Sequence, residues 1–183
     1  QAGEAVKLFD QVYFDLPGEV APKLALGMAA ELSGNLDLAI HMYDLVSRTD
    51  SNYVSASFGL SRCNRAKGNR KSAVEALDRI PQSSSTFVRS RVEAARILIG
   101  LDESNRRAAV PEIADLEAAS LVCDSLVLEG ASRYILHHAV LTSALDCLRL
   151  KKNRAAVKGK KILGSDMDET HLRLDLENSL RTL

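Results

Sequence analysis

The sequence has few aromatic residues, which make up 4% of its 183 residues, and it has no tryptophan. Hydrophobic residues nevertheless make up 46%, so the core must consist mainly of Leu, Ala, Val and Ile. Stacked helical repeats have cores of this kind. Nothing in the patterning suggests a sheet, and the composition therefore favours an all-α fold.

Charge of one sign and long apolar runs are also lacking. The 24 Lys and Arg residues balance 24 Asp and Glu residues, for a formal net charge of +0. Nucleic-acid binding usually needs a positive surplus to meet the phosphates, so nucleic acid is not expected as the main partner. No apolar run approaches the roughly 20 residues of a membrane-spanning helix. We therefore expect no direct membrane insertion.

Cysteine is scarce as well. Cys63, Cys123 and Cys147 are far apart, form no C-x-x-C pair and have no histidine at metal-binding spacing. Their apolar helical surroundings favour buried, reduced thiols, which fit a reducing cytoplasm. The sequence therefore predicts no metal and no cofactor within this chain, and a cytoplasmic location.

What the sequence does contain is a repeat with a period of 34 residues. The two full copies comprise Leu26, Gly27, Gly34, Ala39 and Tyr43, and then Leu60, Ser61, Gly68, Ala73 and Leu77. This period is typical of the tetratricopeptide repeat (TPR), a pair of antiparallel helices. The sequence therefore predicts an all-α TPR helical solenoid.

The repeated residues have physical roles in such a helix pair. Two helices cross closely only where their residues are small, as Gly27 and Ala39 are. Gly34 and Gly68 can take the left-handed conformation that ends a helix. Asn35 and Asn69 then follow as caps of the next helices.

Stepping back by one period predicts a partial repeat at the start of the chain. Ala5, Phe9 and Pro17 fall on the positions of Ala39, Tyr43 and Ser51. We therefore expect the chain to begin inside a repeat and to be a fragment of a longer protein. Within one domain over 1–183, we predict the second helix of a truncated repeat at 1–17, repeat 1 at 18–52, repeat 2 at 53–86, a degenerate repeat at 87–120, and non-repeat helices that cap the C-terminal end at 121–183.

The same pattern places the individual helices. We expect them near 1–14, 21–33, 36–48, 54–67, 70–80, 87–100, 131–150 and 168–183. The second helix of the degenerate repeat keeps the spacing of Ala109, Ile113 and Leu116 with Pro111 inside it, and its boundaries between 101 and 124 are not predicted.

Four segments carry a resemblance to a known family. They are LPGEVAPKLAL at 16–26, FGLSR at 58–62, ILGS at 162–165 and HLRL at 171–174. They resemble the C-terminal TPR domain of the protein kinase G family, which are soluble serine/threonine kinases of actinobacteria. The resemblance implies a parent chain that also carries a kinase domain and a rubredoxin-like metal module, and that phosphorylates an FHA-domain regulator of 2-oxoglutarate metabolism.

The resemblance further implies that this fragment is a regulatory and docking module without catalysis of its own. The sequence has no glycine-rich phosphate loop, H-R-D loop or D-F-G motif. ATP, Mg²⁺ and a rubredoxin-type metal are thus expected only in the parent. The expected partners are the kinase domain of the same chain, the FHA-domain substrate and a second copy in a homodimer. The alternative is a stand-alone TPR scaffold or adaptor that binds peptide segments of a protein partner.

Candidate contact residues follow from the family's ligand-facing positions on the concave surface. They are Leu24, Met28, Glu31, Ser55, Phe58, Arg62 and Arg65, and Leu32 occupies a further such position. We expect an apolar patch beside Arg62 and Arg65 to hold a partner segment with one acidic group. Alternatively, Leu24, Met28 and Phe58 pack against the neighbouring repeat.

A second candidate surface lies on the first helix. Cutting through a repeat would expose the apolar side chains of Val6, Phe9, Val12 and Tyr13. Exposed apolar faces of this kind favour association. We therefore expect these four residues to mediate self-association.

Overall fold

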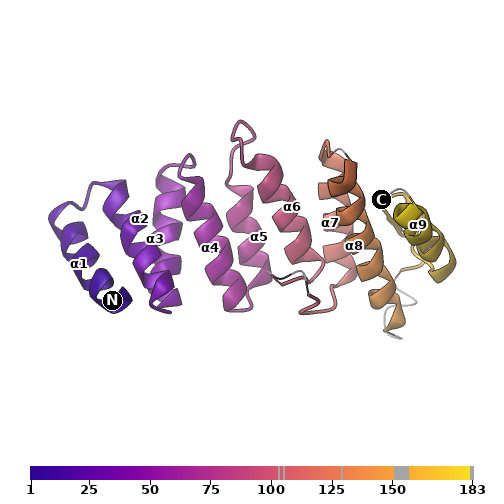
Figure 1. Cartoon of the computed structure of the whole chain (residues 1–183), viewed down its shortest axis with the longest axis horizontal. Helices are drawn as coiled ribbons and strands as arrows, with labels where there is room; N and C mark the ends of the chain where they lie inside the picture. The colour runs from indigo at the N-terminus through magenta and orange to yellow at the C-terminus, as the bar shows by residue number, and fades with distance from the viewer. Residues whose placement is uncertain (103, 105, 129, 151–156, 182–183) are drawn as a thin grey trace. The chain divides into compact units, whose positions relative to one another are not determined.

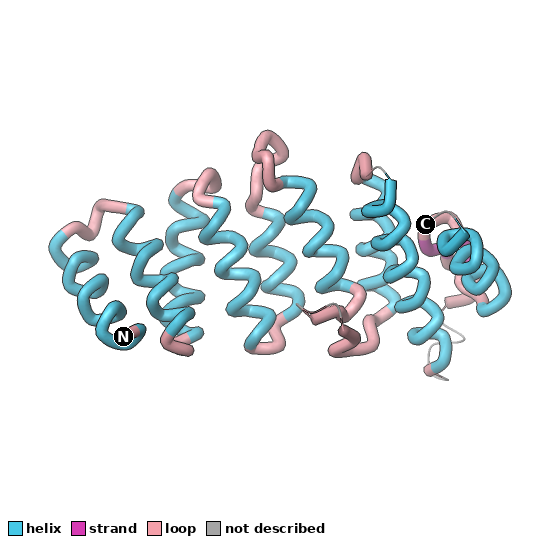
Figure 2. Tube along the Cα trace, viewed as in Figure 1, coloured by secondary structure: helices cyan, strands magenta, loops and turns pink. Residues whose placement is uncertain are grey.

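The computed structural model describes residues 1–102, 104, 106–128, 130–150 and 157–181. In this part of the chain the dominant element is the α-helix, and the helices are joined by loops (Figure 2). Contacts divide the chain into a first unit, residues 1–90, and a second unit, residues 91–183. The predicted all-α helical-repeat fold is confirmed, and each unit has its own core.

The first unit is a series of antiparallel helices (Figure 1). They are α1 (Ala2–Asp15), α2 (Val20–Leu32), α3 (Leu36–Thr49), α4 (Val54–Ala66) and α5 (Arg70–Asp78), followed by the start of α6 (Phe87–Leu98). Each of the first five packs against the next along the chain. Their bounds lie within two residues of those expected from the repeat, because the turn residues define the helix ends.

The turns of the first unit have the predicted geometry. Gly34 and Gly68 have φ of 80° and 79°, in the left-handed region that glycine adopts readily. The Asn35 side chain accepts a hydrogen bond from the Leu38 amide, at 3.3 Å, and thereby caps α3. Asn69 differs, because its side chain makes no such bond at the start of α5 within the described residues.

Tyr43 lies at the centre of the first unit and is 1% exposed. A Cβ atom added at Gly59 would lie 2.5 Å from ring carbons of Tyr43, and one at Gly27 would lie 3.1 Å away. The ring is therefore accommodated by glycines on both α2 and α4. Sequence reasoning identified Gly27 as a close-approach residue but did not give Gly59 this role, because Gly59 falls outside the matched repeat positions.

The second unit continues from α6 with longer and less regular elements. They are α7 (Ile113–Ser125), α8 (Gly130–Arg149), β1 (Lys161–Ile162), β2 (Ser165–Asp166) and α9 (Glu169–Arg181). The core of this unit contains the fully buried side chains of Ile99, Leu116, Val140, Ile162 and Leu172. The last helix was expected to reach 183, and residues 182–183 lie outside the described residues.

The degenerate repeat needs a correction. Pro111 lies before α7 and not inside it, and the helix begins at Ile113 and continues to Ser125. A proline cannot donate the backbone hydrogen bond that a helix interior requires. The start is defined instead by a capping box, in which the side chains of Glu112 and Asp115 bond to each other's backbone amides.

The absence of sheet signals was also misleading in one place. Strands β1 and β2 form an antiparallel hairpin with Ile162 opposite Ser165. Its two-residue turn has positive φ at both positions, 53° at Leu163 and 83° at Gly164, as a type I′ turn requires. Leucine rarely adopts this conformation. Here the Leu163 amide donates to the Ser120 hydroxyl of α7, at 2.8 Å, and this contact holds the turn in place.

Candidate protein-binding surfaces

The predicted contact residues lie on α2 and α4, the first helices of the two full repeats. We call the part formed by Met28, Glu31, Leu32 and Arg62 the first-helix surface. Met28 is 51% exposed and Leu32 is 81% exposed. These two residues are one helical turn apart, so their side chains lie on the same face of α2. Exposed apolar side chains at this spacing provide a contact for a partner.

The other predicted residues contribute differently. Leu24 and Phe58 are half-buried, and Leu24 packs against the core of the first unit. The Arg89 guanidinium lies 5.2 Å from the centre of the Phe58 ring, a cation–π contact made within the chain. Ser55 is exposed and Arg65 is half-buried. Both predicted interpretations therefore apply, since part of the set packs internally while Met28 remains accessible.

Glu31 and Arg62 form a bidentate ion pair between α2 and α4. Arg62 Nε donates to Glu31 Oε1 at 2.8 Å, and Arg62 Nη2 donates to Oε2 at 2.8 Å. The hydroxyl of Tyr43 donates to the same Oε2 at 2.7 Å. The network therefore joins three consecutive helices, α2, α3 and α4, with directional bonds to one carboxylate.

The electrostatics of this network follow from its burial and its donors. Burial by itself would raise the pKa of Glu31, but the hydrogen bonds from Arg62 and Tyr43 outweigh it, and the net pKa is lowered. Burial, followed by the hydrogen bond to Glu31, raises the pKa of Tyr43 far above its ordinary value. At neutral pH the carboxylate is thus ionised and the phenol keeps its proton.

This geometry changes what the first-helix surface offers to a partner. Arg62 was expected to meet an acidic group of a bound segment, but its guanidinium already meets the Glu31 carboxylate. Sequence reasoning named both residues without pairing them. Their separation of 31 residues places them on adjacent repeats, and that spacing was the available signal. The surface presents apolar side chains beside an ion pair that is neutral as a whole.

Helix α1 presents the second candidate surface. Leu8, Phe9 and Val12 are 62%, 37% and 40% exposed, and they lie along one side of the helix. Of the residues predicted for self-association, Val6 instead packs against the core of the first unit. Tyr13 is half-buried beneath Lys23, whose ammonium lies 5.7 Å from its ring. Sequence reasoning missed Leu8, although its helical spacing to Val12 was available.

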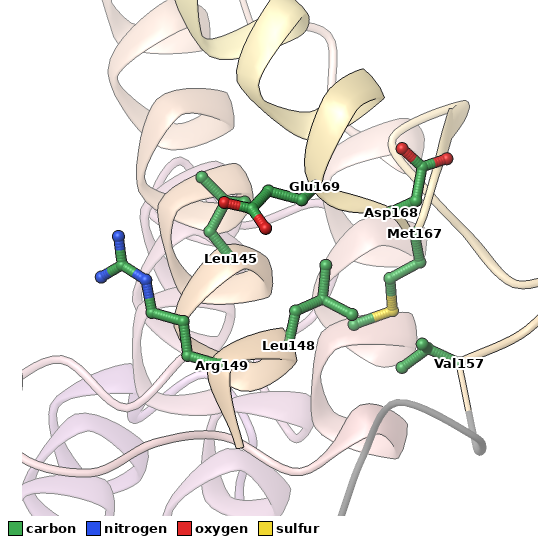
Figure 3. A pocket seen from close by; sticks show the side chains of 7 residues that line it. All are labelled: Leu145, Leu148, Arg149, Val157, Met167, Asp168 and Glu169. Carbon is green, nitrogen blue, oxygen red and sulfur yellow. The ribbon is translucent and has the colours of Figure 1, made fainter. Parts of the chain in front are cut away.

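A pocket in the second unit lies between the end of α8 and the start of α9 (Figure 3). It has a volume of about 320 Å³ and is lined by Leu145, Leu148, Arg149, Val157, Met167, Asp168 and Glu169. Its charged groups already have partners. Arg149 pairs with Asp146, and Glu169 pairs with Arg173.

The third charged residue of that pocket, Asp168, serves the start of α9. Its carboxylate accepts bonds from the backbone amides of Thr170 and His171 and contacts the His171 ring at 2.6 Å. These bonds, led by that from the His171 backbone, lower the pKa of Asp168. The carboxylates of this pocket therefore stabilise the helix and are not arranged as a catalytic pair.

The cysteines are buried, as predicted, and they are poor nucleophiles. Burial raises the pKa of Cys63 to about 11 and that of Cys123 to about 12, so these thiols remain protonated at neutral pH. The described residues contain no group of His, Cys, Asp or Glu side chains placed to hold a metal ion. Nor does any helix in the described ranges have the length and apolarity to cross a membrane. The surfaces found are suited to binding.

Comparison with known families identifies the repeat. Residues 1–183 match the model of the protein kinase G tetratricopeptide repeat. The chain belongs to this family. The resemblance read from the sequence is thereby confirmed.

Two relatives of this protein kinase G TPR domain are full kinases. The chain is 36% identical over 179 residues to the serine/threonine-protein kinase PknG of Mycolicibacterium smegmatis, and equally so to that of Mycobacterium leprae. In both cases the match covers 98% of this chain and 22% of the relative. The chain therefore spans about a fifth of the length of these kinases.

Solved structures support the fold alone. MamA superposes with a TM-score of 0.53 at 12% identity, covering 97% of this chain and 85% of MamA. TPR-like repeats of a putative kinesin light chain from Podosopora anserina superpose with a TM-score of 0.54 at 16% identity, covering 99% of this chain and 90% of that one. Both likenesses agree with helical repeats of the TPR type.

Proposed function

We propose that this chain is a non-catalytic regulatory and docking domain of a serine/threonine protein kinase. The family match and the kinase relatives support the link to a kinase. The observation that carries the docking role is the pair Met28 and Leu32, exposed on the first-helix surface next to the Glu31–Arg62 ion pair. Since the paired Arg62 leaves no isolated charge there, the favoured partner is an apolar segment.

The energetics of such docking are modest but sufficient. Burying a large apolar side chain contributes roughly 1.5–3 kcal/mol. Two such side chains on one helical face can thus anchor a segment, while the ion pair supplies polar atoms at its edge. Binding of this strength raises the local concentration of a substrate without needing a tight complex.

The finer functions are proposals on the same basis. The parent chain is a kinase that phosphorylates an FHA-domain regulator of 2-oxoglutarate metabolism, and it acts in the cytoplasm. It binds ATP, Mg²⁺ and a rubredoxin-type metal through residues outside this chain. The kinase domain of the same chain is a further partner. Two copies pair through Leu8, Phe9 and Val12 of α1, whose exposed side chains motivate the homodimer.

The test replaces the exposed apolar pair in the full-length parent. Met28→Asp combined with Leu32→Asp should raise the KM for the FHA-domain substrate about tenfold and leave kcat unchanged, because only docking is lost. The matched control is Leu121→Asp, which alters a residue of α7 that is 70% exposed and lies outside the first-helix surface. It should leave both constants as they are.

Two results would count against this proposal. Unchanged KM in the double variant would remove substrate docking from the first-helix surface. A parent without kinase activity would favour the alternative, a stand-alone scaffold or adaptor for peptide segments. Thermal unfolding of each variant, followed by circular dichroism, separates a docking defect from a folding defect.

A further inference from the structure

The second unit contains a larger pocket that is independent of the proposed docking surface. It has a volume of about 530 Å³, within the range of small-molecule sites. Its apolar lining includes Val92 of α6, Leu101, and Leu136 and Ala139 of α8. Two arginines, Arg96 and Arg107, also line it. We call it the Arg96–Arg107 pocket.

Arg107 has an unsatisfied donor in this pocket. Its Nη2 atom pairs with Asp146 Oδ2 at 3.3 Å. Its Nη1 atom is buried and has no hydrogen-bond partner among the described residues. Leaving a charged donor unpaired away from water is costly. An acceptor that enters the pocket would therefore gain more from Arg107 than from a solvated arginine.

The positive charge at Arg107 is only partly neutralised. Asp146 is shared, because Arg149 pairs with its other oxygen at 3.2 Å. Arg96 has a loose pair with Glu93, at 3.5 Å. Around this pocket three guanidinium groups thus meet two carboxylates among the described residues. The remaining charge is complementary to an anion.

The backbone holds Arg107 in position. Leu101 and Arg107 face each other across an antiparallel bridge. The Ala108 amide donates to the Gly100 carbonyl at 2.9 Å, and Asp102 accepts bonds from the amides of Ser104 and Arg106 at 2.8 Å each. A site whose donor is already oriented loses little entropy when a ligand binds.

We propose that the Arg96–Arg107 pocket binds a small-molecule monocarboxylate with an apolar body. The carboxylate accepts hydrogen bonds from Arg107 Nη1 and lies near the Arg96 guanidinium. The apolar body occupies the space lined by Val92, Leu136 and Ala139. Bidentate recognition by arginine favours a planar carboxylate, and the apolar walls reject small, fully polar anions.

The test uses decanoate, below its micellar concentration, as the probe in isothermal titration calorimetry with this chain. We expect one site. Arg107→Gln should weaken decanoate binding about 10- to 100-fold, because a charged hydrogen bond is lost. The matched control, Arg133→Gln, removes the same charge from an exposed position on α8 outside the pocket lining and should leave the affinity unchanged.

A second variant keeps the test valid if Arg107→Gln does not fold. Ile135 lines the pocket and is 60% exposed, so Ile135→Glu should preserve the fold while its charge repels the carboxylate. Decanol, which has the same chain length without the charge, should bind wild type and Arg107→Gln alike. Absence of decanoate binding to wild type, or equal affinity in every variant, would overturn the proposal. Tighter competition by a peptide that ends in a leucine carboxylate would overturn it in favour of a protein ligand.

Discussion

The two units of this domain have different kinds of order. In the first unit, close approach of the helices depends on small residues at repeat spacing, and the Tyr43 ring lies against Gly27 and Gly59. In the second unit, contacts between non-repeating elements hold the core, such as the bond from the Leu163 amide to Ser120. The comparison teaches that a periodic sequence produces a continuous interface, while loss of the period lets loops and pockets form between helices.

The largest test of this difference concerns a glycine of the second unit. Gly100 has φ of 79°, and a Cβ there would lie 2.2 Å from the Ala109 carbonyl oxygen. Gly100→Ala should lower the free energy of unfolding by roughly 3 kcal/mol, because left-handed strain adds to a backbone clash. Gly68→Ala is the matched control in the first unit, with the same φ but open space around it. Urea denaturation should show a loss near 1 kcal/mol for the control, and equal losses would show that the clash is relieved.

A smaller effect is expected from overfilling the repeat interface. Gly59→Ala places a methyl group against the buried Tyr43 ring and should cost about 2 kcal/mol. Gly3→Ala, in α1, meets no atom within 4 Å and should instead stabilise the helix by about 0.5–1 kcal/mol. The same urea measurement compares them. A neutral Gly59→Ala would mean that the repeat interface adapts as readily as a loop.

The smallest expected effect tests the polar link between repeats. The lowered pKa of Glu31 means that its stabilising effect is present above about pH 4.5, its ordinary value, and is lost as pH falls towards the folded-state pKa. Glu31→Gln should cost about 1 kcal/mol at pH 7, and the difference from wild type should shrink below pH 4.5.

The control for this change is an exposed ion pair. Glu75→Gln removes a surface partner of Lys71, 4.0 Å away, and should cost at most about 0.5 kcal/mol. Chemical denaturation at several pH values compares the two variants. A Glu31→Gln difference that is constant from pH 7 to pH 3 would show that packing, and not charge, accounts for its effect.

Much of the first unit could be predicted from residue types alone. Gly34 and Gly68 defined the helix ends, and Asn35 acts as the cap that was expected. The candidate surface was predicted less well, because exposure depends on neighbours that the repeat spacing does not describe. Met28 is accessible, whereas Val6 packs inward and Arg62 is paired with Glu31.

The second unit shows where local signals were insufficient. Pro111 could be placed inside or before a helix by spacing, and the capping box of α7 decides the matter. The hairpin at Leu163 has an unfavourable local residue, and its geometry depends on Ser120, which lies 43 residues earlier in the chain.

The sequence by itself determined the helical repeat, its period of 34 residues and the family, because small residues, turn glycines and apolar positions recur at fixed spacing. Only the tertiary structure decided which charges remain available. Arg62 and Arg107 look alike in the sequence, yet one is neutralised by Glu31 and the other has a buried, unpaired nitrogen. The physical reason is that pairing and burial depend on side chains far apart in the chain, which only folding brings together.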